Sequence, residues 1–449
     1  MKNRNEFKEE NKMKKALSVA LCASMLGAMM LGQTANVMAE GDGAELEFYH
    51  GYFQDDWQPA VEMRKIYDEF AAENPGFKPI AIQTGSEGVG DKVTSEVANG
   101  SFPNMVDLAG NNVLEAAISG ELVLDLKPII DEDEDLKAGV GTANYEQNQV
   151  DGKIYTVRDQ IETQGFWYNE AIFEEAGAAL PETWTSWEDF SKAAQTIRDA
   201  GFTAYMLEES SSQRLAGAWL ASTEAGRAML EGLPEEFDTE EFKATMAAIG
   251  AELKANGENN ISAKGDAYRD DFFKGSPVGT PKVAMCFNGV WDAGSAAASD
   301  FKDDIKPATY PSGDNDAAAR FAYSSAGAGY AISADLGEEQ KELAVKFLKY
   351  MMSDEVQTKI ITLCEANPGS TRIDYEGLLA DENTSEGTKK LIEACQLCSE
   401  GTYQMKTLSN VWGGDIAKAV SDQMLLFPTA DDMDQAAQDA ADVLNSLVK

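Results

Sequence analysis

The stretch Gly152–Gly177, GKIYTVRDQIETQGFWYNEAIFEEAG, marks the place where one α/β pattern ends and a second begins. Its first residues are β-like. A second α/β pattern begins after GKIYTV with FWYNEAIFEEAG, in which Trp167 lies in a strand-like run. A helix-like segment, TWTSWEDFSKAAQTIRDAG, and a strand-like segment, FTAYML, come next. The stretch therefore predicts a chain that is built of two α/β units.

The segment before Gly152 alternates between strands and helices. Its strand-like runs are ELEFYH, KPIAIQT and MVDLAG, and its first helix carries Val61, Met63, Ile66, Tyr67 and Phe70 at nearly helical spacing. This β-α-β-α order favours a parallel, doubly wound sheet. Such sheets bind ligands at the carboxyl ends of their strands. Those ends are predicted at residues 50–57, 84–87 and 110–112.

The remainder of the chain contains strand-like segments and then a helix-rich end. The run KVAMCF is strand-like and stops at Asn288-Gly289. The segment DIKPATYPSG is expected to return to the first unit, and AYSSAGAGYAIS is expected to lead back again. No low-complexity linker separates the two units, so strands are expected to cross the boundary between them.

The N-terminus has the pattern of an export signal. A basic, polar lead precedes the apolar run ALSVALCASMLGAMMLG, and Val37-Met38-Ala39 has the small-residue spacing of a cleavage site. Residues 1–39 are therefore predicted to be a cleaved signal peptide. The alternative is a lipid anchor on Cys22, which the bulky Leu21 disfavours. The mature protein is expected to be exported, to a periplasm or to the outer face of the cell membrane.

The charge balance excludes several classes of partner. The 449 residues include 37 Lys and Arg and 77 Asp and Glu, a formal net charge of −40. Such a field repels phosphate backbones and anionic lipid surfaces, so nucleic acid is not an expected partner. With 43% apolar residues the chain still has enough apolar surface for ordinary cores.

Cysteine and histidine usage disfavours metal and redox chemistry. Cys395 and Cys398 could form a thiol redox pair or half of a zinc site, or pack in a core as small apolar side chains. No second Cys/His pair with ligand spacing exists, which favours packing. His50 is the only histidine, so His-based triads and multi-histidine metal sites are excluded. The glycines of GSEGVGDKVTS lack the contiguous Gly-Lys of a phosphate loop. No cofactor or metal is therefore expected.

Several segments together resemble one protein family. Gly152–Gly177 followed by PETWTSWEDFSKAAQTIRDAG is similar to the central signature of extracellular solute-binding proteins, which deliver sugars to ATP-binding-cassette (ABC) importers and include maltose-binding protein. The segments ANGSFPNMVDL, KVAMCFNGVW, ELAVKFLKYMMSDEVQTK and NVWGGDIAKAV fit the order of this family. The resemblance covers nearly all of residues 45–449.

The resemblance implies a two-lobe, periplasmic-binding-protein-like (class II) α/β fold. Each lobe would be a doubly wound sheet, and crossing strands would form a hinge between the lobes. The implied ranges are 44–157 and 305–325 for lobe 1 and 158–304 and 326–449 for lobe 2, with crossings near 155–162, 304–309 and 323–330. Ser324, Ser325 and Gly327 are the expected hinge residues, because small residues permit changes in φ and ψ.

Three tryptophans are candidates for contact with a sugar ring. A pyranose has an apolar face that stacks on flat aromatic rings. Trp291 matches the Asn-Gly-x-Trp element of the family, Trp412 matches a late aromatic residue that stacks on sugar, and Trp57 lies in the first cleft loop. Burial in a core is the alternative for each of them. Core packing is instead expected for the remaining tryptophans, Trp167, Trp184, Trp187 and Trp219.

Polar candidates lie at strand ends and crossings, where they could bind sugar hydroxyls. By resemblance, Glu162 aligns with a glutamate that contacts sugar in the maltose-binding group, and the amides Asn111 and Asn112 stand where that group has an Asp-Arg pair. Asp55 and Asp56 are candidates in the first cleft loop. Glu208, Glu209 and Arg372 are further candidates, and each of these three could equally be a surface charge.

The expected function is capture of a sugar or oligosaccharide by hinge closure. The resemblance implies a monomer that is not an enzyme and that delivers its ligand to the membrane permease subunits of an ABC importer. The alternatives are a glycoside hydrolase, which would use two of the many carboxylates, and a carbohydrate-binding surface adhesin.

Overall fold

The computed structural model describes residues 45–108, 113–207, 212–257, 260–261, 267–311, 320–325, 327–399 and 402–448. The export signal predicted for residues 1–39, including Cys22, lies outside this part of the chain. None of the helices formed by the described residues has the length and hydropathy needed to cross a membrane.

The first lobe is built on a four-stranded sheet with the order β13-β3-β1-β2. Its strands are β1 (Leu46–His50), β2 (Phe77–Ala81), β3 (Met105–Asp107) and β13 (Tyr330–Ile332). β1 is parallel to both β2 and β3, whereas β13 is antiparallel to β3. The predicted parallel order of the first three strands is therefore confirmed.

Helices cover both faces of this sheet, because its strands alternate buried side chains between the two faces. Phe48 packs on one face with Phe347 of α14 (Glu338–Met351) and with Tyr67 of α2 (Gln58–Glu73). Val106 packs on the other face in a cluster with Val89 and Val93 of α3 (Gly85–Ala98). The lobe is doubly wound, as predicted.

The second lobe is built on a sheet with the order β10-β7-β9-β8. Its strands are β7 (Phe166–Asn169), β8 (Thr203–Met206), β9 (Val283–Cys286) and β10 (Ile305–Ala308). β8 and β9 are parallel, and β7 is antiparallel to β9. The large aromatic core of this lobe contains Trp184, Trp187 and Trp219, which are buried as expected.

The motif Tyr-Asn-x-x-x-Phe-x-x-x-Gly forms a strand-to-helix connection in this lobe. Asn169 ends β7 and caps helix α7 (Glu170–Ala176), because its side-chain oxygen accepts a hydrogen bond from the N–H of Ile172. Phe173 is fully buried, and Gly177 adopts φ 70° at the helix end. The recognisable spacing therefore follows from local folding rather than from ligand contact.

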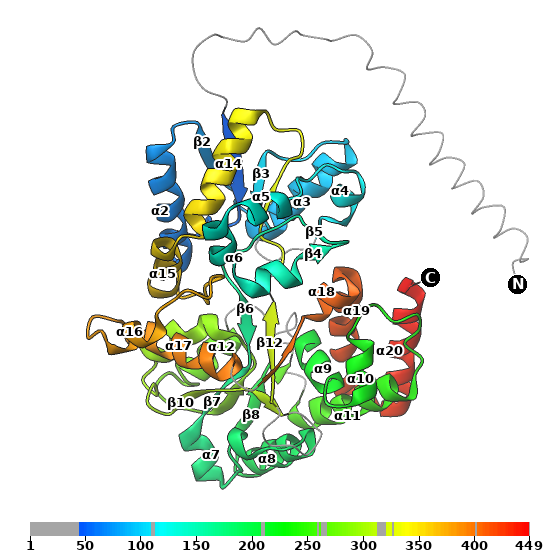
Figure 1. The fold of residues 1–449 in the computed structure, drawn as a ribbon. Helices are drawn as coiled ribbons and strands as arrows, with labels where there is room; N and C mark the ends of the chain where they lie inside the picture. The colour runs from blue at the N-terminus through cyan, green and yellow to red at the C-terminus, as the bar shows by residue number, and fades with distance from the viewer. Residues whose placement is uncertain are drawn as a thin grey trace, which may run out of the picture. The chain divides into compact units, whose positions relative to one another are not determined.

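Three segments connect the lobes. β6 (Glu162–Gln164) pairs antiparallel with β12 (Arg320–Ser325), and the two strands lie side by side between the lobes (Figure 1). The third segment lies between α15 (Asp354–Thr362), which packs in the first-lobe core, and α16 (Tyr375–Ala380). The Ile161 N–H donates to the Asn367 carbonyl at 2.8 Å, which ties this segment to the β6 segment.

Strand pairing corrects the expected lobe ranges. The crossing expected at 304–309 is wrong, because β10 pairs with β7 inside the second-lobe sheet. Residues 326–449 do not all belong to lobe 2, since β13 pairs with β3 and α14 packs on β1. The expected ranges therefore assigned β10 to lobe 1 and both β13 and α14 to lobe 2, and the structure places each of them in the other lobe.

The four cysteines that the structure describes are buried and form no disulfide with one another. Cys395 and Cys398 lie on the buried face of α17 (Glu386–Ser399). Burial raises the pKa of the Cys398 thiol to about 12 and that of Cys395 well above its usual range. Both side chains are core residues in this structure, which agrees with the favoured interpretation.

Candidate functional site

Two adjoining cavities lie where the lobes meet at the crossing segments. The first has a volume of about 350 Å³ and the second about 420 Å³. Arg158, Gln160, Trp291 and Ala366 line both of them, so the cavities form one continuous groove. Trp57, at the start of α2, lies at the second cavity, and Trp291 of the second lobe lies between the two.

Trp291 is positioned by the residues that precede it. It lies in a short 3₁₀ helix, η4 (Val290–Asp292), directly after β9. Gly289 leaves space for the indole, because a Cβ added there would lie 2.2 Å from the ring. The Gly289 carbonyl accepts a hydrogen bond from the Trp167 indole at 2.9 Å. The Asn-Gly-x-Trp element therefore fixes an aromatic ring at the edge of a strand.

Gly289→Ala is expected to weaken ligand binding by about tenfold, or about 1.4 kcal/mol, because it displaces a ring that lines both cavities. The added Cβ cannot occupy its position unless the indole moves. Titration calorimetry with a ligand of the wild-type protein measures the loss of affinity. Gly232→Ala is the control, because no atom lies within 4 Å of a Cβ added at that position. Equal affinities of both variants would contradict the role given to Gly289.

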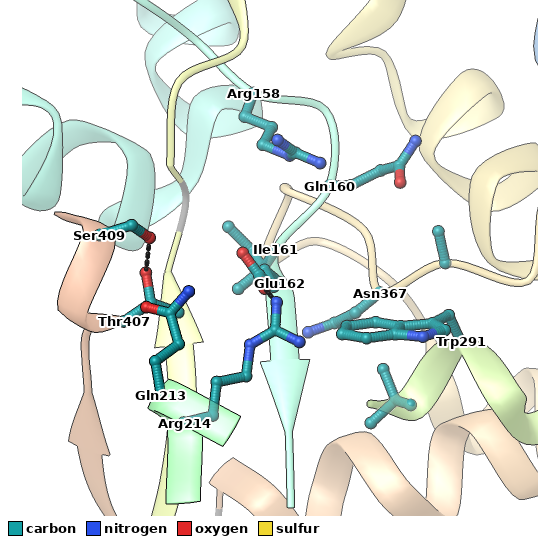
Figure 2. Close-up of a pocket in the computed structure, with 12 residues that line it drawn as sticks. Arg158, Gln160, Ile161, Glu162, Gln213, Arg214, Trp291, Asn367, Thr407 and Ser409 are labelled. Atoms are coloured by element: carbon teal, nitrogen blue, oxygen red, sulfur yellow. Dashed lines mark hydrogen bonds and ion pairs between the residues drawn. The ribbon is translucent and has the colours of Figure 1, made fainter. Parts of the chain in front are cut away.

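The first cavity presents hydrogen-bonding side chains from four separate elements. Glu162 of β6 forms an ion pair of 2.5 Å with Arg214 of α9 (Ser212–Leu220), and the Arg214 guanidinium lies 5.6 Å from the centre of the Trp291 ring. Figure 2 shows Glu162, Arg214 and Trp291 gathered around this space. Thr407 and Ser409, hydrogen-bonded to each other at 3.0 Å, lie on the opposite side (Figure 2). In the Glu162–Arg214 pair, the guanidinium can donate hydrogen bonds to neighbouring hydroxyls and the carboxylate can accept hydrogen bonds from them.

The second cavity combines aromatic, charged and apolar side chains. The Trp57 ring is stacked on Tyr52 with 6.3 Å between ring centres, and 45% of Trp57 is exposed. Arg269 is held by an ion pair with the fully buried Asp292, which in turn accepts a hydrogen bond of 2.6 Å from Asn288. The half-buried Glu365 also lines the cavity and has φ 51°, a strained value for a residue with a side chain.

A buried polar cluster lies beneath this wall of the groove. Tyr330 donates to Asp159 at 2.7 Å, and Tyr67 lies 3.2 Å from the Tyr330 hydroxyl and 3.4 Å from Asp107. Burial, and next the charge of Asp107, raise the pKa of Asp159 to about 7. The folded protein therefore holds a proton on this cluster under conditions in which an exposed aspartate would have lost it.

Asp159→Asn is expected to make the slope of stability against pH more positive than it is in the wild-type protein. The folded-state pKa lies above the unfolded value, so the free energy of unfolding contributed by Asp159 decreases as pH rises from about 4 to about 7. Denaturant unfolding at several pH values in this window measures the slope. The pKa of His50 is lowered to about 4 by burial and by Arg64, which gives the opposite slope, but His50 is present in both proteins and cancels in the comparison. Identical slopes would contradict the prediction.

The structure brings together some of the predicted site residues. Trp291, Trp57 and Glu162 all line the groove. Asp55 and Asp56 do not line either cavity, and Asp55 is 94% exposed and paired with Arg64. Asn111, Asn112, Glu208 and Glu209 lie outside the described residues.

Two predicted ligand residues have other roles in this structure. Trp412 is buried among second-lobe core residues, packs against Phe237, and donates its indole N–H to the Met229 carbonyl at 2.9 Å. Arg372 forms ion pairs with Asp135 at 2.8 Å and Asp354 at 2.6 Å. Neither lines the groove, so both predictions are corrected: protein contacts occupy these side chains.

The predicted hinge residues lie where β12 approaches the first lobe. Ser324 and Ser325 end β12, and Gly327 has φ 56°. Ser325 pairs with Glu162 in the strand register and accepts a hydrogen bond of 2.7 Å from Asn410. The positive φ explains a glycine at position 327. The role of these residues in closure stays a prediction.

Sequence patterns missed most of the polar lining. Arg158 and Gln160 lie within the predicted crossing, but no periodicity distinguishes them from their buried neighbour Asp159. Gln213 and Arg214 occupy a helix, and Asn367 lies in a crossing that was not predicted. Only their position in the first predicted crossing could have indicated that Arg158 and Gln160 line the groove.

Comparisons with known proteins find similar solute-binding proteins. The model of bacterial extracellular solute-binding proteins matches residues 65–372. A Streptococcus pneumoniae solute-binding protein, solved in complex with the blood group A-trisaccharide, is 39% identical and has a TM-score of 0.78, with 89% of this chain and 99% of that chain covered. The multiple sugar-binding protein of Streptococcus mutans is 24% identical over 69% of this chain and 72% of its own length.

A solved chitin oligosaccharide binding protein shares the fold at 19% identity, with a TM-score of 0.69 and with 91% of this chain and all of that chain covered. These similar proteins are binding proteins by description. The family model alone spans more than half of this chain. This chain therefore belongs to the family of bacterial extracellular solute-binding proteins.

Proposed function

We propose that this protein captures a neutral oligosaccharide in the groove and delivers it to the permease of an ABC importer. The observation that carries the proposal is the pair of tryptophans, Trp57 and Trp291, which face one continuous groove from opposite lobes. Aromatic rings with hydrogen-bonding side chains between them match the two kinds of surface on a pyranose. A ligand that contacts both rings would link the lobes.

Hinge closure follows from the same arrangement. A ligand that touches both lobes in a closed form and one lobe in an open form shifts the population toward the closed form by its difference in affinity. We infer that β6, β12 and the segment before α16 bend during this closure. The closed protein would then dock on the permease as an exported monomer, held in a periplasm or at the outer face of the cell membrane.

The relatives support a glycan ligand. The Streptococcus pneumoniae protein that covers 89% of this chain was solved with a trisaccharide, and the Streptococcus mutans protein is described as binding multiple sugars. The hydrolase and adhesin alternatives have no comparable support among these proteins.

A panel of neutral oligosaccharides tests the proposal. The protein without residues 1–39 is mixed with each glycan, and its melting temperature, the binding heat and the recovered glycan are measured. We expect a bound glycan to raise the melting temperature and to be recovered intact. At a ligand concentration one hundred times the Kd, the free energy of unfolding should increase by about 2.7 kcal/mol. Release of reducing ends at catalytic rates would instead support a hydrolase. Absence of binding by every glycan would overturn the proposal.

A further inference from the structure

The two cavities differ in the chemistry of their walls. The first is lined largely by hydroxyl, amide and paired charged side chains, including Gln213, Asn367, Thr407 and Ser409. The second contains apolar side chains that the first lacks, among them Pro59, Met63 and Cys364, together with Arg269 and the shared Arg158. One groove therefore offers two dissimilar environments to two parts of a ligand.

The guanidinium groups make the second cavity a donor site. Arginine has five N–H donors and no acceptor, so ligand atoms that contact it must accept. Arg158 uses Nη1 on the Ala328 carbonyl at 3.0 Å, and its buried Nε has no hydrogen-bond partner among the described residues. The Arg158 guanidinium points toward Gln160 (Figure 2). The guanidinium lines the second cavity beside Gln160, so a ligand atom that accepts a hydrogen bond is favoured there.

An apolar surface lies directly beside these donors. The Gln160 amide nitrogen is 3.7 Å from the sulfur of Met63, and the thiol of Cys364 also lines the cavity. Burial raises the pKa of the Cys364 thiol, so this thiol stays neutral. A ligand hydroxyl placed against this surface would lose its water without gaining a partner, whereas a methyl group would gain contact.

The charge of the surroundings favours a neutral acceptor over a carboxylate. Arg269 is already paired with Asp292, and Glu365 lines the same cavity. Burial lowers the pKa of Arg158, but the neighbouring Tyr52, Asp107, Asp159 and Glu162 outweigh this effect and raise it. The chain as a whole carries a net charge of −40, which repels anions. A neutral group with a carbonyl oxygen and an apolar end fits all these observations.

We propose that the second cavity binds an acetamido-bearing sugar residue, whose carbonyl oxygen accepts from Arg158 and whose methyl group packs on Met63 and Cys364. The neighbouring sugar residue would occupy the first cavity and offer its hydroxyls to the Glu162–Arg214 pair. This inference rests on the proposed function and narrows the ligand to oligosaccharides that contain an N-acetylated hexosamine.

Matched disaccharides that differ in the acetamido group test the inference. Calorimetry compares N-acetyllactosamine with lactose, and N,N′-diacetylchitobiose with cellobiose. At least one acetamido sugar should bind about tenfold or more tightly than its hydroxyl counterpart, the factor expected for a hydrogen bond to a charged donor. Equal or tighter binding of both hydroxyl sugars, or no binding of either acetamido sugar, would overturn the inference. Binding of other neutral glycans in either case would leave the proposed function standing.

Two arginine variants locate the source of the preference. Arg158→Gln should reduce the ratio between the two affinities toward one. Arg214→Gln, in the first cavity, should weaken both sugars while the ratio stays within about threefold of the wild-type value, as expected for separate sites. Melting curves confirm that each variant is folded. An unchanged ratio in folded Arg158→Gln would overturn the assignment of the carbonyl to Arg158, and the wild-type comparison tests the inference whether or not this variant folds.

Discussion

Trp291→Ala is expected to lower glycan affinity about 30- to 100-fold, which corresponds to about 2–3 kcal/mol for an aromatic residue at the centre of a binding surface. The ring lines both cavities, so we expect its removal to take away contact area for the parts of a glycan proposed to bind in each of them. Calorimetry with the best glycan of the panel measures the change. The melting temperature without ligand should fall little, because part of the ring faces the groove rather than a core.

Trp184→Ala is the matched control for this experiment. Trp184 is 1% exposed, stacks on Phe166, and donates its indole N–H to the Ala179 carbonyl at 2.9 Å. Truncation of a buried tryptophan costs about 3–5 kcal/mol of stability, while the groove is left without a direct change. The two variants should therefore show opposite patterns. If Trp291→Ala loses as much stability as Trp184→Ala, Trp291 is a core residue and the site is misassigned.

The contrast between Trp291 and Trp412 shows what the sequence could and could not predict. Both follow a short polar element and precede small residues, so local patterns give them similar ligand roles. They differ in distant contacts. Phe237 and the Met229 carbonyl enclose Trp412, whereas Gly289 and the open groove surround Trp291. Contacts between residues far apart in the sequence decide which ring is available, and no spacing rule records them.

For the fold too, local elements were predictable from the sequence, whereas contacts between distant elements were not. The first three strands of the first lobe and its first helix, α2, have clear periodicity, and they were predicted in the correct order. The returns between lobes were not, because β10 and β13 have only four and three residues and carry no period that tells which sheet they join. Similarly, Arg158 and Gln160 alternate with the buried Asp159 in a crossing segment, where only the position of the groove separates them.

Asp292→Asn is expected to reduce the free energy of unfolding by about 3 kcal/mol, the cost of removing one partner from a buried charge pair. Asp292 is completely buried, and its carboxylate pairs with Arg269 and accepts a hydrogen bond from Asn288. The amide keeps the size of the side chain but not the charge, so the variant isolates the electrostatic contribution. Denaturant unfolding without ligand measures the loss.

A double-mutant cycle with Arg269→Met separates the pair from its surroundings. Arg269→Met alone leaves the Asp292 carboxylate buried without this guanidinium, so it should also be destabilising. The double variant should lose less stability than the two single losses added together, since residues in direct contact couple by about 0.5–3 kcal/mol. Additive losses would mean that Arg269 and Asp292 are stabilised independently. Asp292 directly follows Trp291 and holds a guanidinium on the wall of the second cavity. We therefore expect Asp292→Asn to lower ligand affinity as well as stability.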